Sequence, residues 1–453
     1  MYDLIVIGGG PGGGEGVEAA RHAGMSVLLI EEKHLGGVCL NEGCIPSKTL
    51  LYCAKLYKHA KESEAYGVIS QNVSFDLKKA MERKESIISK LRKGSEFSKK
   101  KAGVEVIMGR ATILPKKDNA FVVSANNTEY TSKNLLVCTG SQAFKPPIPG
   151  ADQPWVLTNR EILSLDTIPK NLVIIGGGVI GIEFATFFSA IGSNVTIVEM
   201  LPSIATMLDN DIRTMLRKEL EKSGITIRTS CAVTAIGDHS VTFTDTTTNT
   251  SETLPADNAL LSVGRRPVTS GLGLENLGVT IERGAIKTDE CGRTNVPNLY
   301  AAGDVNGVSM LAHTASRESA VVIDTIMGKK NRVNYDTIPG VIYGFPEVAW
   351  VGMTQAEAQK RGIEVAVNTI PLTFSGRYMA ETQMGRGVFK VVVDKKYKTV
   401  LGVHMIGHEC SEMIQSAVIM IENELRIADV RDMVFPHPTV SEVLKDALVG
   451  VKF

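Results

Sequence analysis

The sequence predicts an α/β fold in which two parallel βαβ units precede a smaller α+β domain. An apolar strand runs into a glycine-rich turn twice, at residues 3–7 and again at residues 172–175, and a helical pattern and a further strand follow each turn. From about residue 335 the chain changes to alternating apolar strands and helices without such a turn. Strands that alternate with helices form parallel sheets covered on both faces, which is the basis of this prediction.

Both turns match a phosphate-binding fingerprint with glycine at positions one, three and six. The glycines are Gly8, Gly10 and Gly13 in the first unit and Gly176, Gly178 and Gly181 in the second. Such glycines let the backbone approach a pyrophosphate, whose charge the following helix N-terminus stabilises. A single match would also fit a turn that is glycine-rich for packing reasons, but two in the same strand context predict two Rossmann-like, dinucleotide-binding domains.

An acid ends the second strand of each unit. The strands at 26–30 and 194–198 lead to Glu31 and Glu199, about 20 residues after the first glycine, where a ribose-binding acid is expected. A carboxylate there hydrogen-bonds ribose hydroxyls and repels a 2′-phosphate, so Glu199 favours NAD over NADP. The alternative is that Glu199 is only a solvated carboxylate at a strand end.

The intervening sequence indicates where one domain gives way to the next. A charged amphipathic helix is expected at residues 77–101, and a cluster of prolines, Pro146, Pro147 and Pro149, indicates a linker. We therefore expect the chain to divide at residues 1–145, 146–266, 267–334 and 335–453. The third segment contains a short apolar strand at 299–301 and a helix from about 311, and it is expected to complete the domain that the first segment begins.

Composition and charge narrow the classes of function. The chain of 453 residues has 49 basic and 49 acidic residues and no long basic run, so nothing predicts a nucleic-acid partner or an anionic membrane. It has no apolar stretch long enough to span a bilayer and opens directly into a strand, which predicts a cytoplasmic protein. Seven scattered cysteines are unlike a secreted disulfide framework, so a disulfide here would be catalytic.

Two cysteines, Cys39 and Cys44, lie just after the first fingerprint in the run GGVCLNEGCIPSK. Gly43 permits a curl that can bring their Cα atoms within the roughly 4.4–6.8 Å a disulfide needs, and Pro46 suits the first turn of a helix starting near Cys44. The helix dipole would lower the pKa of a thiol at that start. We expect a dithiol that exchanges electrons with a bound dinucleotide. The alternative is a pair of buried, inert thiols.

Two further expectations concern buried side chains. Glu183 falls in the run IEFATFF, which is apolar nearly all round, so its carboxylate should be buried. Because an unpaired buried carboxylate is costly, we expect a partner for it. We also expect four other cysteines to be buried and to behave as small hydrophobic residues: Cys53, Cys138, Cys231 and Cys291.

The order of motifs across the whole chain resembles the flavoprotein disulfide reductases. The motifs are the two fingerprints, CLNEGCIPSK, CTGS, SVGRRP, AAGDV, LAHTA and HPTVSE. The resemblance implies that the first unit binds FAD, the second binds NAD and the last domain forms the interface of a homodimer. The residues it assigns to FAD are Gly8, Gly10, Gly13, Glu31, Lys48, Gly140 and Asp304. Those it assigns to NAD are Gly176, Gly178, Gly181, Glu199 and Gly264.

The resemblance also implies catalytic roles. Cys39 would exchange with substrate, Cys44 would contact the flavin, and Lys48 would pair with Glu183 beside it. His437 would be the general acid/base, held by Glu442 and acting on the cysteines of the other subunit. Histidine suits this task because its ordinary pKa is about 6.5.

Plainer explanations stay open for several of these residues. Lys48 could be a solvated helix lysine, and Asp304 could be an ordinary turn acid. Thr439 and Glu442 have the spacing of a capping box for the last helix, so Glu442 could merely cap it while His437 lies in a loop.

The activity that the resemblance implies is the oxidation of dihydrolipoamide to lipoamide with NAD. The partner would be a lipoyl-bearing protein of a 2-oxo acid dehydrogenase or a glycine-cleavage system. The alternatives are a reductase of the same family acting on glutathione or mercuric ion, which Glu199 and a C-terminus without extra cysteines disfavour, and a flavin-bearing NAD sensor without dithiol turnover. Two departures from the family pattern are Phe435-Pro436 before His437 and the helix start Gly14-Glu15-Gly16.

Overall fold

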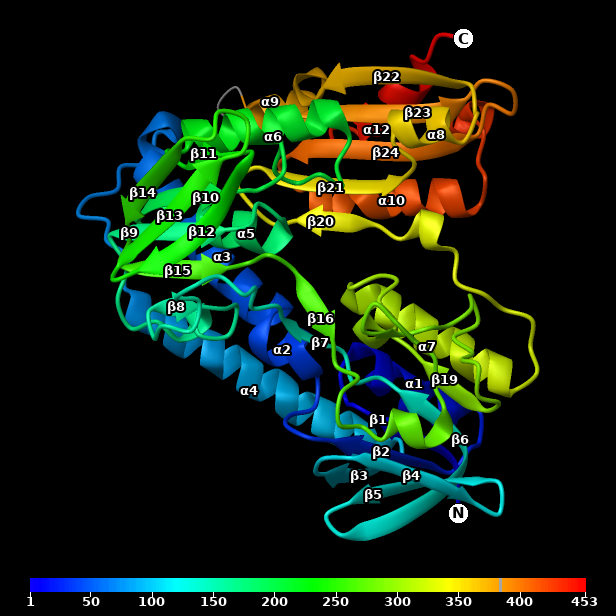
Figure 1. Cartoon of the computed structure of the whole chain (residues 1–453). Helices are drawn as coiled ribbons and strands as arrows, with labels where there is room; N and C mark the ends of the chain where they lie inside the picture. The colour runs from blue at the N-terminus through cyan, green and yellow to red at the C-terminus, as the bar shows by residue number, and fades with distance from the viewer. Residues whose placement is uncertain (383–384) are drawn as a thin grey trace.

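The computed structural model describes residues 1–382 and 385–453, which form three sheet-based layers (Figure 1). The first layer is a seven-stranded sheet in the order β3-β2-β1-β6-β5-β4, with β19 paired to β6. Its strands are β1 (Tyr2–Ile7), β2 (Val27–Glu31), β3 (Glu105–Met108), β4 (Thr112–Lys117), β5 (Ala120–Ala125), β6 (Thr128–Val137) and β19 (Leu299–Ala301). Strands β1, β2, β3, β6 and β19 are parallel to one another, whereas β5 runs antiparallel to β6 and to β4. The apolar runs of β1 and β2 are buried because one face packs against α1 and α7, and the other packs against β4, β5 and apolar residues of the segment 272–286.

Five helices belong to this part of the chain: α1 (Pro11–His22), α2 (Gly37–Glu42), α3 (Cys44–Glu62), α4 (Leu77–Lys101) and α7 (Ala312–Ile326). The helix expected at residues 77–101 is confirmed as α4. Helix α1 packs closely against α7, and this contact explains one glycine of the unusual Gly14-Glu15-Gly16 start. A Cβ on Gly16 would lie 3.1 Å from Cδ2 of Leu136 and 3.4 Å from Cβ of Ser319 on α7, so a larger residue would push the two helices apart.

The second layer is an all-parallel sheet of five strands in the order β11-β10-β9-β15-β8. Its strands are β8 (Val156–Leu157), β9 (Asn171–Ile175), β10 (Asn194–Val198), β11 (Thr226–Arg228) and β15 (Asn258–Leu261). The helices are α5 (Val179–Ala190) and α6 (Asn210–Lys222), and the antiparallel strands β12 (Cys231–Gly237), β13 (Ser240–Asp245) and β14 (Ser251–Pro255) form a separate sheet. Two chain crossings between the first two layers, β7 (Ser141–Ala143) and β16 (Arg265–Pro267), pair with each other.

The third layer is an antiparallel sheet in the order β20-β21-β24-β23-β22, at the top of Figure 1. Its strands are β20 (Gly340–Ile342), β21 (Glu347–Gly352), β22 (Val365–Pro371), β23 (Val388–Asp394) and β24 (Val400–Gly407). The accompanying helices are α8 (Gln355–Lys360), α9 (Gly376–Glu381), α10 (Cys410–Glu422), α11 (Ile427–Asp432) and α12 (Glu442–Val449). A two-stranded hairpin, β17 (Ile281–Glu282) with β18 (Ala285–Ile286), lies before β19.

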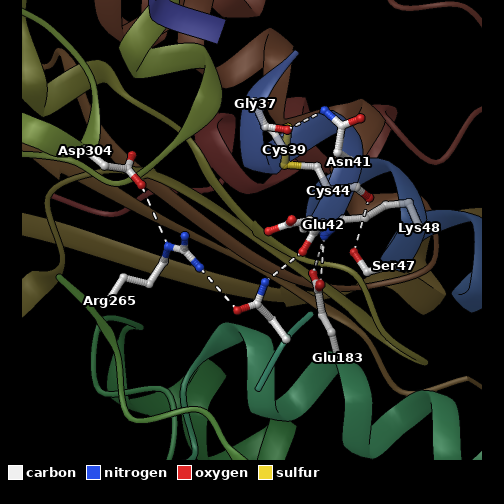
Figure 2. Close-up of a disulfide and its surroundings, with 11 residues drawn as sticks. Gly37, Cys39, Asn41, Glu42, Cys44, Ser47, Lys48, Glu183, Arg265 and Asp304 are labelled. Atoms are coloured by element: carbon white, nitrogen blue, oxygen red, sulfur yellow. Dashed lines mark hydrogen bonds and ion pairs between the residues drawn. A yellow bond between two sulfur atoms is a disulfide. The ribbon is translucent and has the colours of Figure 1, made fainter. Parts of the chain in front are cut away.

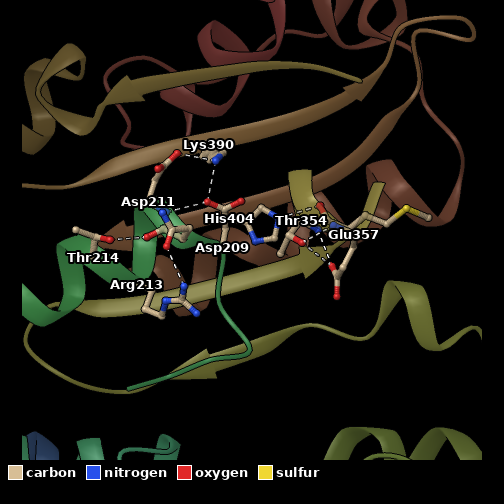
Figure 3. A network of polar contacts seen from close by, with 10 residues as sticks. Asp209, Asp211, Arg213, Thr214, Thr354, Glu357, Lys390 and His404 are labelled. Carbon is tan, nitrogen blue, oxygen red and sulfur yellow. Dashed lines mark hydrogen bonds and ion pairs between the residues drawn. The ribbon is translucent and has the colours of Figure 1, made fainter. Parts of the chain in front are cut away.

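A buried polar cluster ties the second layer to the third (Figure 3). The ammonium of Lys390 on β23 lies 2.8 Å from Oδ1 of Asp209 and 2.6 Å from Oδ2 of Asp211, at the start of α6. Lys390 and Asp209 are each only 4% exposed, so the two charges neutralise each other away from water. His404 on β24 lies in the same cluster, with Nε2 3.0 Å from the carbonyl oxygen of Met353.

In the part of the chain that the structure describes, every helix is too short or too polar to cross a bilayer.

Candidate active site

A disulfide joins Cys39 and Cys44, with their Cα atoms 4.7 Å apart. Cys39 lies in α2, and Cys44 is the first residue of α3. Gly43 separates the two helices, and a Cβ on it would lie 3.1 Å from the carbonyl oxygen of Val38, so the tight curl favours glycine. The sequence prediction of a paired dithiol is therefore confirmed in its geometry. After reduction, the thiol of Cys44 would lie at a helix N-terminus, where the dipole stabilises a thiolate.

Lys48 lies one helical turn after Cys44 on α3 and pairs with Glu183 of α5 (Figure 2). Its ammonium is 2.8 Å from Oε1 and 2.7 Å from Oε2 of a carboxylate that is buried. The backbone N–H of Tyr343 also donates to Oε1, at 3.1 Å. Burial raises the pKa of Glu183, while the ammonium and the amide act in the opposite direction. The partner expected for Glu183 is thus Lys48, and the alternative of an unpaired, solvated Lys48 is wrong.

Both fingerprints form tight strand-to-helix turns. Gly8 and Gly176 adopt φ of 101° and 107°, which only glycine adopts readily. A Cβ on Gly13 would lie 1.8 Å from the carbonyl oxygen of Gly8, and one on Gly181 would lie 2.2 Å from that of Gly176. By contrast, no atom lies within 4 Å of a Cβ placed on Gly178. Both turns thus have close helix–strand packing, and the second has open space at its third position, as a bound pyrophosphate requires. At the third position of the first turn, a Cβ on Gly10 would lie 3.7 Å from Cα of Gly37.

Glu31 and Glu199 occupy equivalent places beside these turns. Oε2 of Glu31 accepts the N–H of Gly9 at 2.6 Å, and Oε2 of Glu199 accepts that of Gly177 at 2.6 Å. Glu199 also accepts the N–H of Leu201 at 2.7 Å. Each carboxylate is therefore fixed at its turn, and Glu199 is not the freely solvated strand-end acid of the alternative interpretation.

A cavity of about 260 Å³ opens between the first fingerprint and the disulfide. Gly9, Gly10, Gly36 and Cys39 line it, together with Glu18 and Lys99. Open space beside the fingerprint glycines, bordered by a helix N-terminus and by the disulfide-bonded Cys39, fits a dinucleotide whose pyrophosphate lies at the turn.

Three predicted FAD and NAD residues lie where the chain crosses between the first two layers. Gly140 and Gly264, with φ of 69° and 110°, directly precede β7 and β16, and no atom lies within 4 Å of a Cβ on either. Asp304 follows β19 and accepts a hydrogen bond from the hydroxyl of Ser141. Arg265 lies 3.8 Å from the same carboxylate oxygen (Figure 2). The structure thus brings Gly140 and Asp304 together through Ser141.

His437 pairs with Glu442 at the start of the last helix. Nδ1 of His437 lies 2.8 Å from Oε1 of Glu442, and the His437 side chain is 80% exposed. Oε2 of Glu442 accepts the backbone N–H of Thr439 at 2.7 Å. This hydrogen bond and the one from His437 lower the pKa of Glu442. The contact is made through Nδ1, so Nε2 is the ring nitrogen that Glu442 does not hold.

The alternative of a capping box between Thr439 and Glu442 is met in one of its two hydrogen bonds only, the one from the Thr439 N–H to Glu442. Helix α12 begins at Glu442, with Ser441 as its N-cap. Because Thr439 lies two residues before that cap, its hydroxyl does not reach a first-turn amide and instead donates to the carbonyl oxygen of Pro436 at 2.9 Å. Glu442 therefore does more than cap the helix, since its other oxygen holds His437.

The burial expected of the unpaired cysteines is correct for Cys138 and Cys231 and wrong for Cys53 and Cys291. Cys53 is partly exposed because α3 buries only one of its faces. Cys291 lies in a turn, where its thiol donates to the carbonyl oxygen of Asn331. A fifth free cysteine, Cys410 at the start of α10, is fully buried and was not among the residues expected to be so.

Two family models match the chain: pyridine nucleotide-disulphide oxidoreductase over residues 2–319, and its dimerisation domain over residues 338–448. The chain is 36% identical to dihydrolipoyl dehydrogenase from Rhizobium etli, covering 99% of this chain and 97% of that one. It is 38% identical to dihydrolipoamide dehydrogenase from Chaetomium thermophilum, with coverages of 99% and 90%.

Two solved structures share the fold of this chain. LpdA from Mycobacterium tuberculosis superposes with a TM-score of 0.91 at 24% identity, covering 99% of both chains. The HOCl-induced flavoprotein disulfide reductase RclA from Escherichia coli superposes with a TM-score of 0.87 at 29% identity, covering 100% of both. The family models cover most of the chain and relatives above 30% identity cover nearly all of it. The chain therefore belongs to the pyridine nucleotide-disulphide oxidoreductase family.

Proposed function

We propose that this protein is an FAD-dependent enzyme that oxidises dihydrolipoamide to lipoamide with NAD. The observation that carries the proposal is the Cys39–Cys44 disulfide at the edge of the cavity beside the first fingerprint. Relatives named dihydrolipoyl or dihydrolipoamide dehydrogenase match the chain over almost its full length, which supports this substrate over glutathione disulfide or mercuric ion.

The two fingerprints would hold the two cofactors. FAD would lie against the first, with its pyrophosphate at the α1 N-terminus and its flavin toward Lys48, Gly140 and Asp304. NAD would lie against the second, with Glu199 on the adenosine ribose and Gly264 nearby. When bound, FAD supplies two-electron transfer between a dithiol and a nicotinamide. A flavin that gains negative charge on reduction would be stabilised by the ammonium of Lys48, which Glu183 keeps in place.

The protein's own sulfurs carry out the exchange with substrate. A thiolate of dihydrolipoamide attacks Sγ of Cys39, the Cys39–Cys44 bond breaks, and Cys44 leaves as a thiolate stabilised by the α3 N-terminus. The second substrate thiolate then attacks its own sulfur in the mixed disulfide and releases lipoamide and the Cys39 thiolate. Nε2 of His437, with its imidazole held by Glu442, accepts the proton of the first attacking thiol, and the departing Cys39 thiolate takes up the proton of the second.

His437 and the disulfide belong to different layers of one chain. Figure 1 places α12 at the top of the molecule and α2 near its middle. An exposed His437 in a domain that matches the family's dimerisation model supports a homodimer in which His437 serves the disulfide of the partner subunit. A lipoyl-bearing protein of a 2-oxo acid dehydrogenase or glycine-cleavage system would supply the substrate, and the cytoplasm would be the site of action.

A comparative assay tests the proposal. Purified holoprotein is given dihydrolipoamide with NAD or NADP, and glutathione disulfide with NADH or NADPH. We expect NADH formation from dihydrolipoamide and NAD to be fastest by a wide margin. Faster turnover of glutathione disulfide would replace the proposed substrate, and no dithiol-dependent reaction at all would indicate a flavin-bearing NAD sensor.

A further inference from the structure

The turn between the two redox cysteines is held from outside by the second layer of the protein. Glu42 lies between Cys39 and Cys44, and its backbone carbonyl accepts a hydrogen bond from Nδ2 of Asn159 at 2.8 Å. Its carboxylate accepts one from Nη2 of Arg160, also at 2.8 Å. Asn159 and Arg160 follow β8, more than a hundred residues along the chain. We call these two residues the Glu42 anchor.

Hydrogen bonds within the second layer and to the crossing strands hold the Glu42 anchor in place. Asn159 is 9% exposed, and its Oδ1 lies 3.5 Å from Nη1 of the partly buried Arg265. Arg265 in turn donates to the hydroxyl and the carbonyl oxygen of Ser141, each at 2.7 Å. The flanking Thr158 donates its backbone N–H to the carboxylate of Glu161 at 2.8 Å, which closes the anchor segment into a turn. The Glu42 anchor is therefore a rigid support.

A second support acts on the neighbouring residue. Oδ1 of Asn41 accepts two hydrogen bonds from the guanidinium of Arg92 on α4, at 2.8 and 3.1 Å. Its amide nitrogen donates to the carbonyl oxygens of Leu35 and Gly37, at 3.1 and 2.8 Å. Both residues at the middle of the cysteine turn are thus tied to other elements, so the turn cannot shift without breaking these bonds.

We propose that Asn159 and Arg160 are positioning residues that hold the turn in its disulfide geometry and so favour the disulfide over the dithiol. Reduction replaces an S–S bond of about 2.05 Å by a longer non-bonded contact, which pushes the two cysteines apart. Bonds that are stronger in one state than in the other shift the equilibrium toward the first state. The inference rests on the proposed role of the disulfide as the redox centre, and it does not depend on which dithiol reduces it.

The test measures the disulfide equilibrium directly. Holoprotein is equilibrated with mixtures of reduced and oxidised dithiothreitol, where breaking one Cys39–Cys44 bond forms two protein thiols and closes the reagent into its cyclic disulfide. The samples are quenched with acid, free thiols are tagged, and the peptide carrying Cys39 and Cys44 is quantified by mass spectrometry. Flavin absorbance in the same samples confirms that the flavin remains oxidised over the range used.

Asn159→Ala should shift the equilibrium constant toward the dithiol by about three- to tenfold, the tenfold limit being about 30 mV for a two-electron couple. Arg160→Ala should shift it about two- to threefold, because the Arg160–Glu42 pair is half exposed. Arg160→Lys, which keeps the charge, should show a smaller shift than Arg160→Ala, with its equilibrium constant closer to that of the parent protein. The matched control is Asn276→Ala, which removes an equivalent amide bond of 2.8 Å to the carbonyl oxygen of Ile113 outside the site.

The outcomes separate the anchor from the proposed function. Equal equilibrium constants for the parent protein, Arg160→Ala and Asn159→Ala would overturn the proposed role of the Glu42 anchor, even if dihydrolipoamide is turned over normally. A shift in the anchor variants with none in Asn276→Ala supports the anchor, even if dihydrolipoamide proves not to be the substrate. Should Asn159→Ala fail to fold, the half-exposed Arg160 and its lysine variant still decide the matter.

Discussion

The ammonium of Lys48 lies 2.7 Å from the nearer carboxylate oxygen of Glu183 and 4.5 Å from the ring centre of Tyr343. These residues come from α3, from α5 and from the position just after β20, so the ion pair and its contacts with Tyr343 together link all three layers of the molecule. Because Lys48 is only one turn from Cys44, the same pair that neutralises a buried carboxylate also places a positive charge beside the disulfide.

Removing Lys48 should expose the cost of the buried carboxylate. In Lys48→Met, Glu183 keeps its burial but loses its counter-ion, and breaking a buried pair in this way costs about 3–5 kcal/mol of unfolding free energy. Lys48→Met/Glu183→Gln should recover most of the loss, since the charge is then gone. Denaturant unfolding of both variants measures this, with Lys145→Met on the surface as control. A loss of the same size in the double variant would contradict the ion-pair explanation.

The loss in Lys48→Met should shrink at lower pH. Burial raises the pKa of Glu183 above its unfolded value of about 4.3, so the folded state binds the proton more tightly than the unfolded state. A group whose pKa is raised in the folded state stabilises the fold at pH values below its unfolded-state pKa. This stabilisation is lost as the pH rises through its folded-state pKa. Without the ammonium the folded pKa rises further. We therefore expect the stability gap between the parent and Lys48→Met to narrow from pH 7 to pH 5, measured by unfolding in matched buffers.

Substitution of Cys44 should stop the dithiol reaction, whereas substitution of Cys53 on the same helix should not. Cys44→Ser removes the sulfur proposed to pass electrons to the flavin, so NADH formation from dihydrolipoamide should stop. Transfer of electrons from NADH to ferricyanide, which needs the flavin and no dithiol, should persist. Cys53→Ser, on the same helix outside the disulfide, is the control and should keep full activity. Normal dihydrolipoamide oxidation by Cys44→Ser would refute the proposed relay.

His437 should matter for proton transfer and little for binding. His437→Gln should lower kcat with dihydrolipoamide by about 10²–10⁴-fold, the usual contribution of a positioned acid/base. Glu442→Gln should give a smaller loss, because an amide oxygen can still accept the Nδ1–H while the charge is gone. Steady-state kinetics measure both, and the exposed His22 is the control as His22→Gln. An unchanged kcat in His437→Gln would exclude it as the base.

The parts of the fold that the sequence predicted well are those whose signal is local. The two βαβ units follow from glycine spacing and apolar strands, and the disulfide follows from two cysteines around Gly43. The burial of Glu183 was also evident, because its helix is apolar on every side. Its partner Lys48 came only from the family resemblance, since the two residues lie on helices far apart in the sequence.

What was missed depends on contacts between distant segments. Asn159, Arg160 and Tyr343 stand in no recognisable motif, and they act on the site only because the second and third layers fold against α2 and α3. The alternative of a capping box at Thr439 rested on spacing alone, and only its bond from the Thr439 N–H to Glu442 forms, because the helix starts at Glu442. A local sequence pattern predicts secondary structure and burial. Which side chains contact each other across the molecule depends on how distant segments fold together.

A glycine-to-alanine substitution in each fingerprint should show which fingerprint binds FAD and which binds NAD. In Gly181→Ala the new Cβ would lie 2.2 Å from the carbonyl oxygen of Gly176, and in Gly13→Ala it would lie 1.8 Å from that of Gly8. Such overpacking costs about 1–3 kcal/mol and moves the helix N-terminus away from the pyrophosphate. Gly181→Ala should therefore keep its flavin and its reducible disulfide but bind NAD weakly, whereas Gly13→Ala should be purified with little flavin.

Flavin absorbance per chain and NAD titration measure these two results. Gly94→Ala is the control, because its Cβ would meet no atom within 4 Å and alanine favours the interior of α4. If Gly181→Ala lost flavin and Gly13→Ala kept it, the assignment of FAD to the first turn and NAD to the second would be reversed.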